Sequence, residues 1–429
     1  MPFSKREFLK VGLGAGVAAA SGLASPLIAA TSGADNQQAL PLKPVTGDVQ
    51  PIGADERMAR IAKAQRLMVE HKLDAILLEP GSAMLYFTGI NWWRSERLTA
   101  VVIPREGEIA VVTPYFEEPS VRESMSVGRD VRTWNEHESP FDQVAGILAD
   151  RGIKGGSIGL EDTVRYFVVE GLKKAAPRIA ISSALPVTLG CRMYKSAHEI
   201  ALMRKANEVT LRAYQYVFRG LEAGMGPADV VSMMQNAQGA LGGENAWAMA
   251  LLNEASAYPH GSSQPQTIKP GGIVLMDCGC KVHGYQSDIS RTLVFGEPDK
   301  HQRQVWEQVR QGQQIAFEAA ALGTPAGKVD DAVRAYYESL GYGPGYATPG
   351  LSHRTGHGIG MDGHESVNFV HGESTPLAPG MCFSNEPGLY IFGEFGVRLE
   401  DCIYMTEKGP AWFTVPPDSI DNPLGSLGP

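Results

Sequence analysis

The sequence predicts a two-domain protein in which an α/β domain is followed by an α+β domain. The chain has 429 residues, which exceeds what one hydrophobic core comfortably takes. Helical and strand-like segments alternate from Asp55 onward, as in an α/β domain. In the last third, two strand-turn-strand segments carry paired carboxylates. We therefore expect an amino-terminal domain at residues 56–190 and a second domain at residues 191–429.

The elements of the first domain follow from apolar spacing and from turn residues. They are, in order, helix 57–71, strand 74–78, a hairpin at 98–114 that turns at residues 105–107, helix 141–151, a strand around Ile158, helix 167–175 and a strand near Ile179. A long helix at 199–220 opens the second domain. Helix, strands and a carboxylate hairpin then follow twice, without a repeat in the sequence itself.

The first carboxylate hairpin is built around Asp277 and Asp288. Asp277 ends an apolar run, Asp288 opens another, and Val282-His283-Gly284-Tyr285 lies between them. A turn centred between Val282 and His283 predicts that the two aspartates lie directly opposite each other, with Cβ atoms about 4.5–5.5 Å apart. Both carboxylates would then reach two cations about 3.5–4 Å apart.

Glu386 and Glu400 repeat this arrangement on either side of the turn-forming segment Gly393-Glu394-Phe395-Gly396. His357 lies between the two hairpins. Each carboxylate alone would fit an acidic residue at a strand end, but two such hairpins with a histidine between them favour a metal site. Four carboxylates balance the charge of two divalent cations, which is the arrangement of a hydrolytic centre.

His353 and His364 compete with His357 for the role of imidazole ligand. His357 is favoured because Gly356, Gly358 and Gly360 would let its backbone approach the ions closely.

Seven ordered motifs make the chain resemble the pita-bread metallopeptidases, most closely their prolidase and aminopeptidase P branch. The motifs are Pro259-His260-Gly261, Asp277-Cys278-Gly279, Ser287-Asp288-Ile289-Ser290-Arg291-Thr292, His353-Arg354-Thr355-Gly356-His357-Gly358-Ile359-Gly360, His364-Glu365, Asn385-Glu386-Pro387-Gly388 and Gly396-Val397-Arg398-Leu399-Glu400-Asp401. The resemblance spans about residues 56–415. It implies a creatinase-like amino-terminal domain and a pita-bread catalytic domain.

The resemblance also implies a metal-binding role for five residues. Asp288 and Glu400 would bridge two divalent ions, Asp277 would complete one site, and His357 and Glu386 would complete the other. Oxygen-rich ligation with one imidazole suits Mn²⁺, with Co²⁺, Fe²⁺ or Zn²⁺ as alternatives.

Four catalytic residues follow from the same resemblance: Glu386, His260, His364 and Arg398. Glu386 would take the proton of the attacking water, and the two histidines would hydrogen-bond the substrate and the tetrahedral intermediate. Arg398 would orient a ligand carboxylate or a neighbouring acid. Without the family context, His260 fits a surface loop residue and Arg398 fits a surface ion pair.

The implied reaction is hydrolysis of Xaa-Pro bonds in dipeptides or short peptides, of the prolidase or aminopeptidase P type. The sequence leaves dipeptidase and aminopeptidase action open. Residues 246–249 and 252–255 depart from the family pattern where the residue before the scissile bond would bind. A pita-bread hydrolase of non-proline or non-peptide amide-like molecules is therefore the alternative. Metal-free creatinase-like enzymes and binding-only domains are disfavoured because they have lost the ligand set.

Composition and the family resemblance predict the partners. A net charge of −9 argues against nucleic acid. The family resemblance implies a homodimer in which the loop carrying Trp92 and Trp93 closes over the partner's active site, although core packing with one exposed ring explains this pair equally well. Five cysteines exclude a disulfide scaffold, and Cys278 and Cys280 are expected to be buried on the strand face opposite Asp277.

The first 30 residues have the layout of an export signal. Lys5-Arg6 precedes a Gly- and Ala-rich, mildly apolar run from Val11 to Ala30, which resembles a twin-arginine signal with Lys5 in the first arginine position. We expect export of the folded enzyme to a bacterial periplasm, cleavage near Ala29 or Ala30, and no stable membrane insertion of the mature protein. An uncleaved membrane anchor is the alternative. Residues 31–55 are predicted to be a flexible lead-in.

Overall fold

The computed structural model describes residues 42–427. The predicted export signal and the first part of the predicted lead-in lie outside these residues. The rest of the lead-in is irregular but packed, because its apolar side chains Leu42, Val45 and Val49 contact the core. The Val45 amide also donates a hydrogen bond to the Leu241 carbonyl at 2.9 Å. No helix in the described part of the chain is long and apolar enough to cross a membrane.

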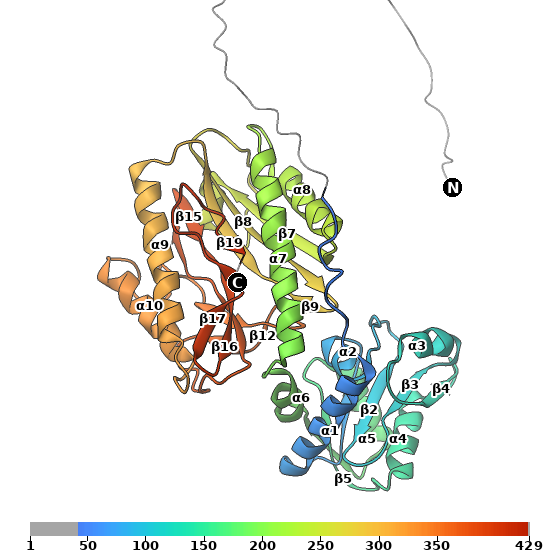
Figure 1. Cartoon of the computed structure of the whole chain (residues 1–429). Helices are drawn as coiled ribbons and strands as arrows, with labels where there is room; N and C mark the ends of the chain where they lie inside the picture. Colours follow the sequence, from blue (N-terminus) through green and yellow to red (C-terminus); the bar gives the residue numbers. More distant parts are fainter. Residues whose placement is uncertain (1–41, 428–429) are drawn as a thin grey trace, which may run out of the picture. The chain divides into compact units, whose positions relative to one another are not determined.

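The amino-terminal region is an α/β domain around a six-stranded sheet in the order β4-β3-β2-β1-β5-β6 (Figure 1). Its strands are β1 Ala75–Leu78, β2 Ala100–Pro104, β3 Ala110–Pro114, β4 Asp130–Trp134, β5 Gly156–Leu160 and β6 Ile179–Ser183. Its helices are α1 Ala54–Glu70, α2 Ser82–Thr88, the 3₁₀ turn η1 Tyr115–Glu117, α3 Glu118–Ser124, α4 Pro140–Asp150, α5 Tyr166–Ala175 and α6 Leu185–Arg192.

Side chains that alternate along β1 and β2 bury both faces of this sheet. Ile76 belongs to the core that includes residues of α1 and α6, whereas Leu77 belongs to the core that includes residues of α4 and α5. Helices therefore cover both faces, as the sequence predicts for this domain.

The second region begins with α7 Ala197–Gly220. Ser196 and Glu199 form a capping box at its start, since the Ser196 hydroxyl accepts from the Glu199 amide and the Glu199 carboxylate accepts from the Ser196 amide. The remaining helices are α8 Pro227–Ala240, the 3₁₀ turn η2 Asn253–Ala257, α9 Lys300–Ala319 and α10 Gly327–Ser339.

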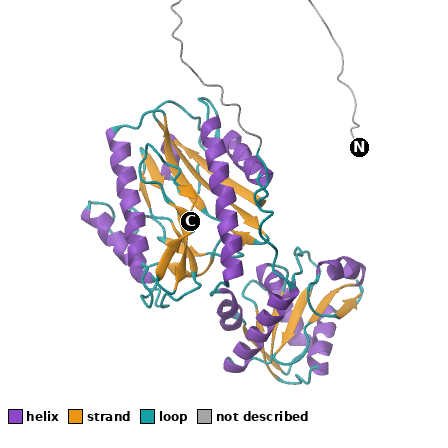
Figure 2. Cartoon of the chain, in the orientation of Figure 1, coloured by secondary structure: helices purple, strands orange, loops and turns teal. Residues whose placement is uncertain are grey.

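Strands fill the space between these helices (Figure 2). They are β7 Glu244–Leu252, β8 Gly272–Val282, β9 Tyr285–Gln286, β10 Ile289–Phe295, β11 Gly356–Gly358, β12 Glu365–Phe369, β13 Cys382–Asn385, β14 Gly388–Ile391, β15 Phe395–Arg398, β16 Asp401–Thr406, β17 Gly409–Trp412, β18 Thr414–Val415 and β19 Ser426–Leu427. One sheet has the order β10-β8-β7 and another has the order β12-β11-β13-β16-β17. The predicted succession of helices, strands and a hairpin occurs twice.

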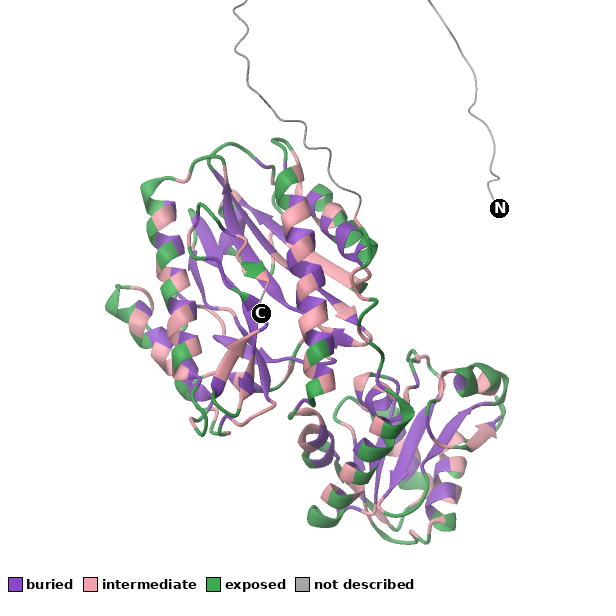
Figure 3. Ribbon diagram, viewed as in Figure 1, coloured by how far each residue is buried: buried purple, intermediate pink, exposed green. Residues whose placement is uncertain are grey.

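The strand β8 separates two cores, and most of its residues are buried (Figure 3). Met276, Cys278 and Cys280 share a core with residues of α7 and α8, whereas Ile273 and Leu275 share a core with residues of α9 and α10. Asp277 therefore points away from α7, toward the second set of strands. Cys278 and Cys280 are buried on the opposite face, as predicted.

The predicted helices and strands are present within a few residues of their expected bounds. In the amino-terminal region, the elements without a prediction are short or polar. The apolar α2 has only 7 residues, and β4 is an edge strand with alternating polar side chains.

Candidate metal centre

The first carboxylate hairpin differs from its predicted register. Val282 pairs with Tyr285, so the turn consists of His283 and Gly284, whose φ angles of 48° and 88° suit a two-residue type I′ turn. The turn centre thus lies one residue later than predicted, and Asp277 lies opposite Ser290 instead of Asp288. The prediction of directly opposed aspartates is wrong. Asp288 nevertheless shares the face of Ser290, two residues away, and is a diagonal neighbour of Asp277.

The second hairpin turns earlier than predicted: residues 392–394 form its turn, whereas Phe395 and Gly396 belong to β15. Gly388 pairs with Arg398 in β14–β15, and Asn385 pairs with Asp401 in β13–β16. Both ladders have the same register. Glu386 and Glu400 therefore face each other at the break between the two ladders.

One cavity of about 680 Å³ brings all predicted site residues together. It is lined by Asp277, Asp288, His357, Glu386, Glu400, His260, His364 and Arg398. Ligand-type atoms of Asp288, His357 and Glu400 lie within 4.8 Å of one another. The two hairpins and β11 thus converge on one centre, as the sequence predicts.

His357 presents one ring nitrogen to the carboxylates. Its Nδ1 lies 3.1 Å from the Gly358 carbonyl oxygen, so Nδ1 carries the proton and donates it to that oxygen. Its Nε2 lies 3.3 Å from Glu386 Oε1 and 3.7 Å from Asp288 Oδ2. Burial lowers the pKa of His357 to about 3, which keeps the ring neutral and the Nε2 lone pair free.

The carboxylates carry more negative charge than this buried cavity accommodates alone. Burial raises the pKa of Asp288 and Glu400 well above the usual carboxyl range, and neighbouring carboxylates raise it further. Burial also raises the pKa of Glu386 to about 7. In the described structure, three buried carboxylate oxygens accept no hydrogen bond: Asp277 Oδ1, Asp288 Oδ1 and Glu400 Oε1. Unpartnered oxygens beside a neutral imidazole fit divalent cations.

Arg398 joins the two hairpins. Its Nη2 donates to Asp277 Oδ2 at 2.5 Å, and its Nε donates to Ser290 Oγ at 2.9 Å. Ser290 in turn donates to Glu400 Oε2 at 2.7 Å. The arginine thus holds one carboxylate directly and another through the serine hydroxyl, which fits the predicted orienting role.

The competing histidines have different environments. His353 Nε2 lies 2.7 Å from the Tyr390 hydroxyl and its Nδ1 lies 2.7 Å from the Arg354 carbonyl oxygen, so neither nitrogen is free. The rings of His364 and His357 meet edge to face at 4.2 Å. Glu365, next to His364, is paired with Arg192 and Lys195 and faces away from the metal ligands.

Two glycines beside His357 are required by the neighbouring strands. A Cβ at Gly356 would lie 2.2 Å from the Ser384 carbonyl oxygen, and a Cβ at Gly358 would lie 2.7 Å from the Glu365 carbonyl oxygen. These glycines let β11 fit between the backbones of β12 and β13. The tight sheet then fixes His357.

The sequence predicts no role for several residues in or beside the cavity. Ser290 lies two residues from Asp288 on the same face, so the strand period was the available signal. Arg354 and Tyr346 line the cavity from the loop that leads into β11. Trp247 and Met249 also line it, in agreement with a pocket at residues 246–249. Residues 252–255 instead line a separate recess.

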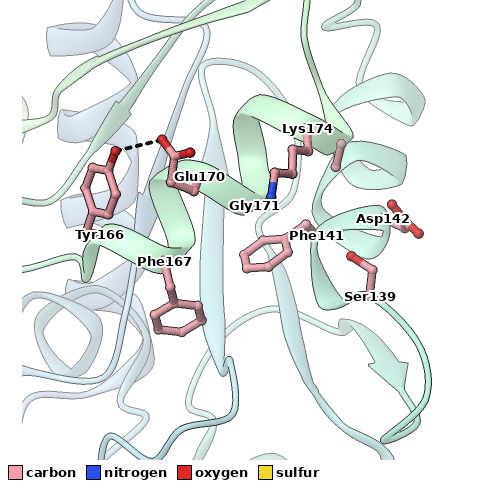
Figure 4. Close-up of a pocket in the computed structure, with 9 residues that line it drawn as sticks. Ser139, Phe141, Asp142, Tyr166, Phe167, Glu170, Gly171 and Lys174 are labelled. Atoms are coloured by element: carbon pink, nitrogen blue, oxygen red, sulfur yellow. Dashed lines mark hydrogen bonds between the residues drawn. The ribbon is translucent and has the colours of Figure 1, made fainter.

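A second large recess lies between α4 and α5 (Figure 4). It has a volume of about 650 Å³ and is lined by Phe141, Tyr166, Phe167 and neighbouring residues. Asp142 and Glu170 also line it, and Glu170 accepts a hydrogen bond from the Tyr166 hydroxyl at 3.0 Å. Among the described residues, the group of ligand-type atoms that lie within 4.8 Å of one another belongs instead to the other cavity.

The Trp92 and Trp93 rings stack at 4.4 Å in the loop before β2. Trp92 packs against the core and Trp93 is 63% exposed.

Comparisons with known proteins agree with this geometry. The family model described as metallopeptidase family M24 matches residues 201–407, and that of the creatinase/prolidase N-terminal domain matches residues 60–194. An Xaa-Pro dipeptidase of Lactobacillus delbrueckii subsp. lactis is 31% identical over 359 residues, which cover 82% of this chain and 95% of the relative.

Two solved structures resemble most of the described fold. The dipeptidase PepE of Mycobacterium ulcerans has a TM-score of 0.79 at 29% identity, covering 86% of this chain and 98% of that one. A prolidase from Thermococcus sibiricus has a TM-score of 0.77 at 28% identity, covering 83% and 96%. The predicted fold class, a creatinase-like domain followed by a pita-bread catalytic domain, is confirmed. The chain belongs to metallopeptidase family M24.

Proposed function

We propose that this protein is a dinuclear metal-dependent dipeptidase that hydrolyses the bond of Xaa-Pro dipeptides. The observation that carries the proposal is the set of three buried, unpartnered carboxylate oxygens beside a neutral His357 in one cavity. The names of the relatives, Xaa-Pro dipeptidase and prolidase, support this substrate class.

Asp277, Asp288, His357, Glu386 and Glu400 would hold two divalent ions, for which we propose Mn²⁺. Four carboxylates with a single imidazole form a hard, oxygen-rich set that suits this ion. When bound, such ions activate a water molecule and polarise the scissile carbonyl.

The chain's own groups perform the proton transfers and hold the substrate. Glu386 accepts the proton of the attacking water at a carboxylate oxygen and passes it to the leaving nitrogen. His260 and His364 line the cavity, and no described group hydrogen-bonds their ring nitrogens, so both are free to donate to the carbonyl oxygen as it gains charge. Arg398 acts as a positioning residue, since Asp277 and Ser290 already occupy its guanidinium.

Replacing His364 by alanine is expected to lower kcat by about 10²–10³-fold, because a donor used mainly in the transition state affects kcat first. Metal content should remain near two ions per chain, because the variant keeps all five proposed ligands. Elemental analysis and steady-state kinetics on Ala-Pro measure both quantities. The exposed His137 in the amino-terminal domain offers a control, and H137A should match the wild type. Loss of metal in H364A would instead make His364 a ligand.

The proposed function is tested by assaying purified protein on Ala-Pro and on Ala-Pro-Ala, after chelation and again after adding Mn²⁺. We expect chelation to abolish hydrolysis of Ala-Pro and Mn²⁺ to restore it. A protein that binds no transition metal and ignores chelators would refute the metallopeptidase proposal. Metal binding without hydrolysis of either peptide would favour the non-proline or non-peptide amide alternative.

We further propose that the chain is exported to the periplasm by the twin-arginine route. The support is sequence alone, namely Lys5-Arg6 followed by the mildly apolar run to Ala30. Fractionation of cells expressing the full chain should find R6Q retained in the cytoplasm. Normal export of that variant would contradict the route.

We also propose a homodimer, on the family resemblance and on the exposed Trp93 ring. Sedimentation velocity of the uncleaved chain should give twice its mass of 46.1 kDa. A monomer at micromolar concentration would contradict the proposal.

A further inference from the structure

Arg354 places a guanidinium in the cavity, on the wall next to His357. Its Nη1 donates to Asn368 Oδ1 at 3.1 Å. Asn368 pairs with His357 across the β11–β12 ladder, so their side chains lie on the same face of the sheet. The bond to Asn368 therefore brings Arg354 to the face from which His357 meets the carboxylates.

The two arginines of the cavity differ in what their guanidinium groups already bind. Arg398 is only 3% exposed, and its three nitrogens donate to Asp277, Ser290, Pro259 and Tyr390. Arg354 is half-buried and makes one side-chain hydrogen bond among the described residues, without an acidic partner. A guanidinium has five N–H donors, so Arg354 retains a pair of N–H groups that can bind both oxygens of a carboxylate.

Arg354 shares its cavity with the largely apolar side chains of Trp247, Met249, Tyr346 and Val370. A carboxylate that enters here meets a cation in a partly enclosed site, where charge-assisted pairs are strong.

The substrate of a dipeptidase carries such an anion close to the bond that breaks. In a dipeptide only the second residue's nitrogen and Cα separate the scissile carbonyl from the α-carboxylate, a reach of about 3.6 Å at most. The residue that binds this carboxylate must therefore lie beside the ligand cluster, which is where Arg354 lies. In a longer peptide an uncharged amide would face the same guanidinium.

We propose that Arg354 binds the free α-carboxylate of the substrate and so makes this chain select dipeptides over longer peptides. The proposal rests on the proposed dipeptidase function. It assigns Arg354 a specificity role, because a substrate without the carboxylate would leave a partly desolvated cation unpaired.

The test compares Ala-Pro with Ala-Pro amide, which keeps the scissile bond but lacks the carboxylate. For the wild type, kcat/KM should be about 10- to 100-fold higher for Ala-Pro. R354Q should lose this preference, mainly through a higher KM for Ala-Pro, with a much smaller effect on the amide. R354K should recover part of the preference, since it keeps the charge without this pair of N–H groups. R219Q removes the same charge from an exposed position of α7 and should match the wild type.

Other outcomes overturn the assignment. Equal losses on both substrates would show that Arg354 supports the fold or the metal site, and metal content and thermal melting would confirm this. An unchanged preference in R354Q would refute the contact. If R354Q does not fold, the ratio of kcat/KM for Ala-Pro to kcat/KM for Ala-Pro amide still tests the proposal in the wild type and in R354K. A wild type that cleaves both substrates equally refutes carboxylate recognition. A wild type that cleaves neither substrate refutes the proposed function itself.

Discussion

Replacing Asp288 by alanine is expected to remove both metal ions and to lower kcat/KM on Ala-Pro by at least about 10³-fold, since metal ions contribute several kcal/mol of charge stabilisation to such reactions. Asp288 lies with Glu400 and His357 in the tightest group of ligand atoms, so its loss affects both proposed ion positions. Elemental analysis of the purified variant gives the metal content, and circular dichroism verifies the fold.

Asp418 provides a matched control because it is an exposed aspartate outside the cavity. D418A should keep two ions and full turnover. If D288A retained one ion and substantial activity, Asp288 would serve a single site and the shared-ligand assignment would fail.

Replacing Asp401 by alanine is expected to lower the free energy of unfolding by about 3–5 kcal/mol, because it leaves the buried charge of Arg291 without its partner. Both side chains are 0% exposed, and the Arg291 guanidinium donates to the two Asp401 oxygens at 2.7 and 3.1 Å. Thr414 and Gln313 also donate to this carboxylate. Urea unfolding at pH 7 measures the loss.

The exposed pair of Arg303 and Asp421 supplies the comparison. D421A should change the free energy of unfolding by no more than about 1 kcal/mol, because solvent screens that pair. If D401A and D421A had equal effects, the buried network behind Glu400 would not stabilise the fold as proposed.

The sequence predicted the composition of the centre better than its geometry. Paired carboxylates and turn residues are local features, so both hairpins and the position of Glu386 opposite Glu400 followed from them. The predicted register of the first hairpin was wrong because a type I′ turn depends on which two residues adopt positive φ. Histidine at position 283 is not an obvious residue for this conformation. One residue of error in the turn centre moved the partner of Asp277 by two positions.

Contacts between distant segments could not be predicted in this way. Arg354 reaches the cavity because Asn368 lies across from His357, and that pairing depends on a strand register with a shift between His357 and Gly358. The link from Arg398 through Ser290 to Glu400 joins β15 to β10. Spacing along the chain carries no signal for either contact.

The common register of the β13–β16 and β14–β15 ladders makes the length of the intervening turn a constraint in its own right. A single residue inserted between Ile391 and Phe395 would turn every following side chain of β15 to the other face, and Arg398 with them. Mutational scanning of this hairpin should therefore tolerate many substitutions at the exposed Phe392 but few insertions or deletions. In a redesign of this protein, the number of residues between Glu386 and Glu400 should be kept, as should the two glutamates themselves.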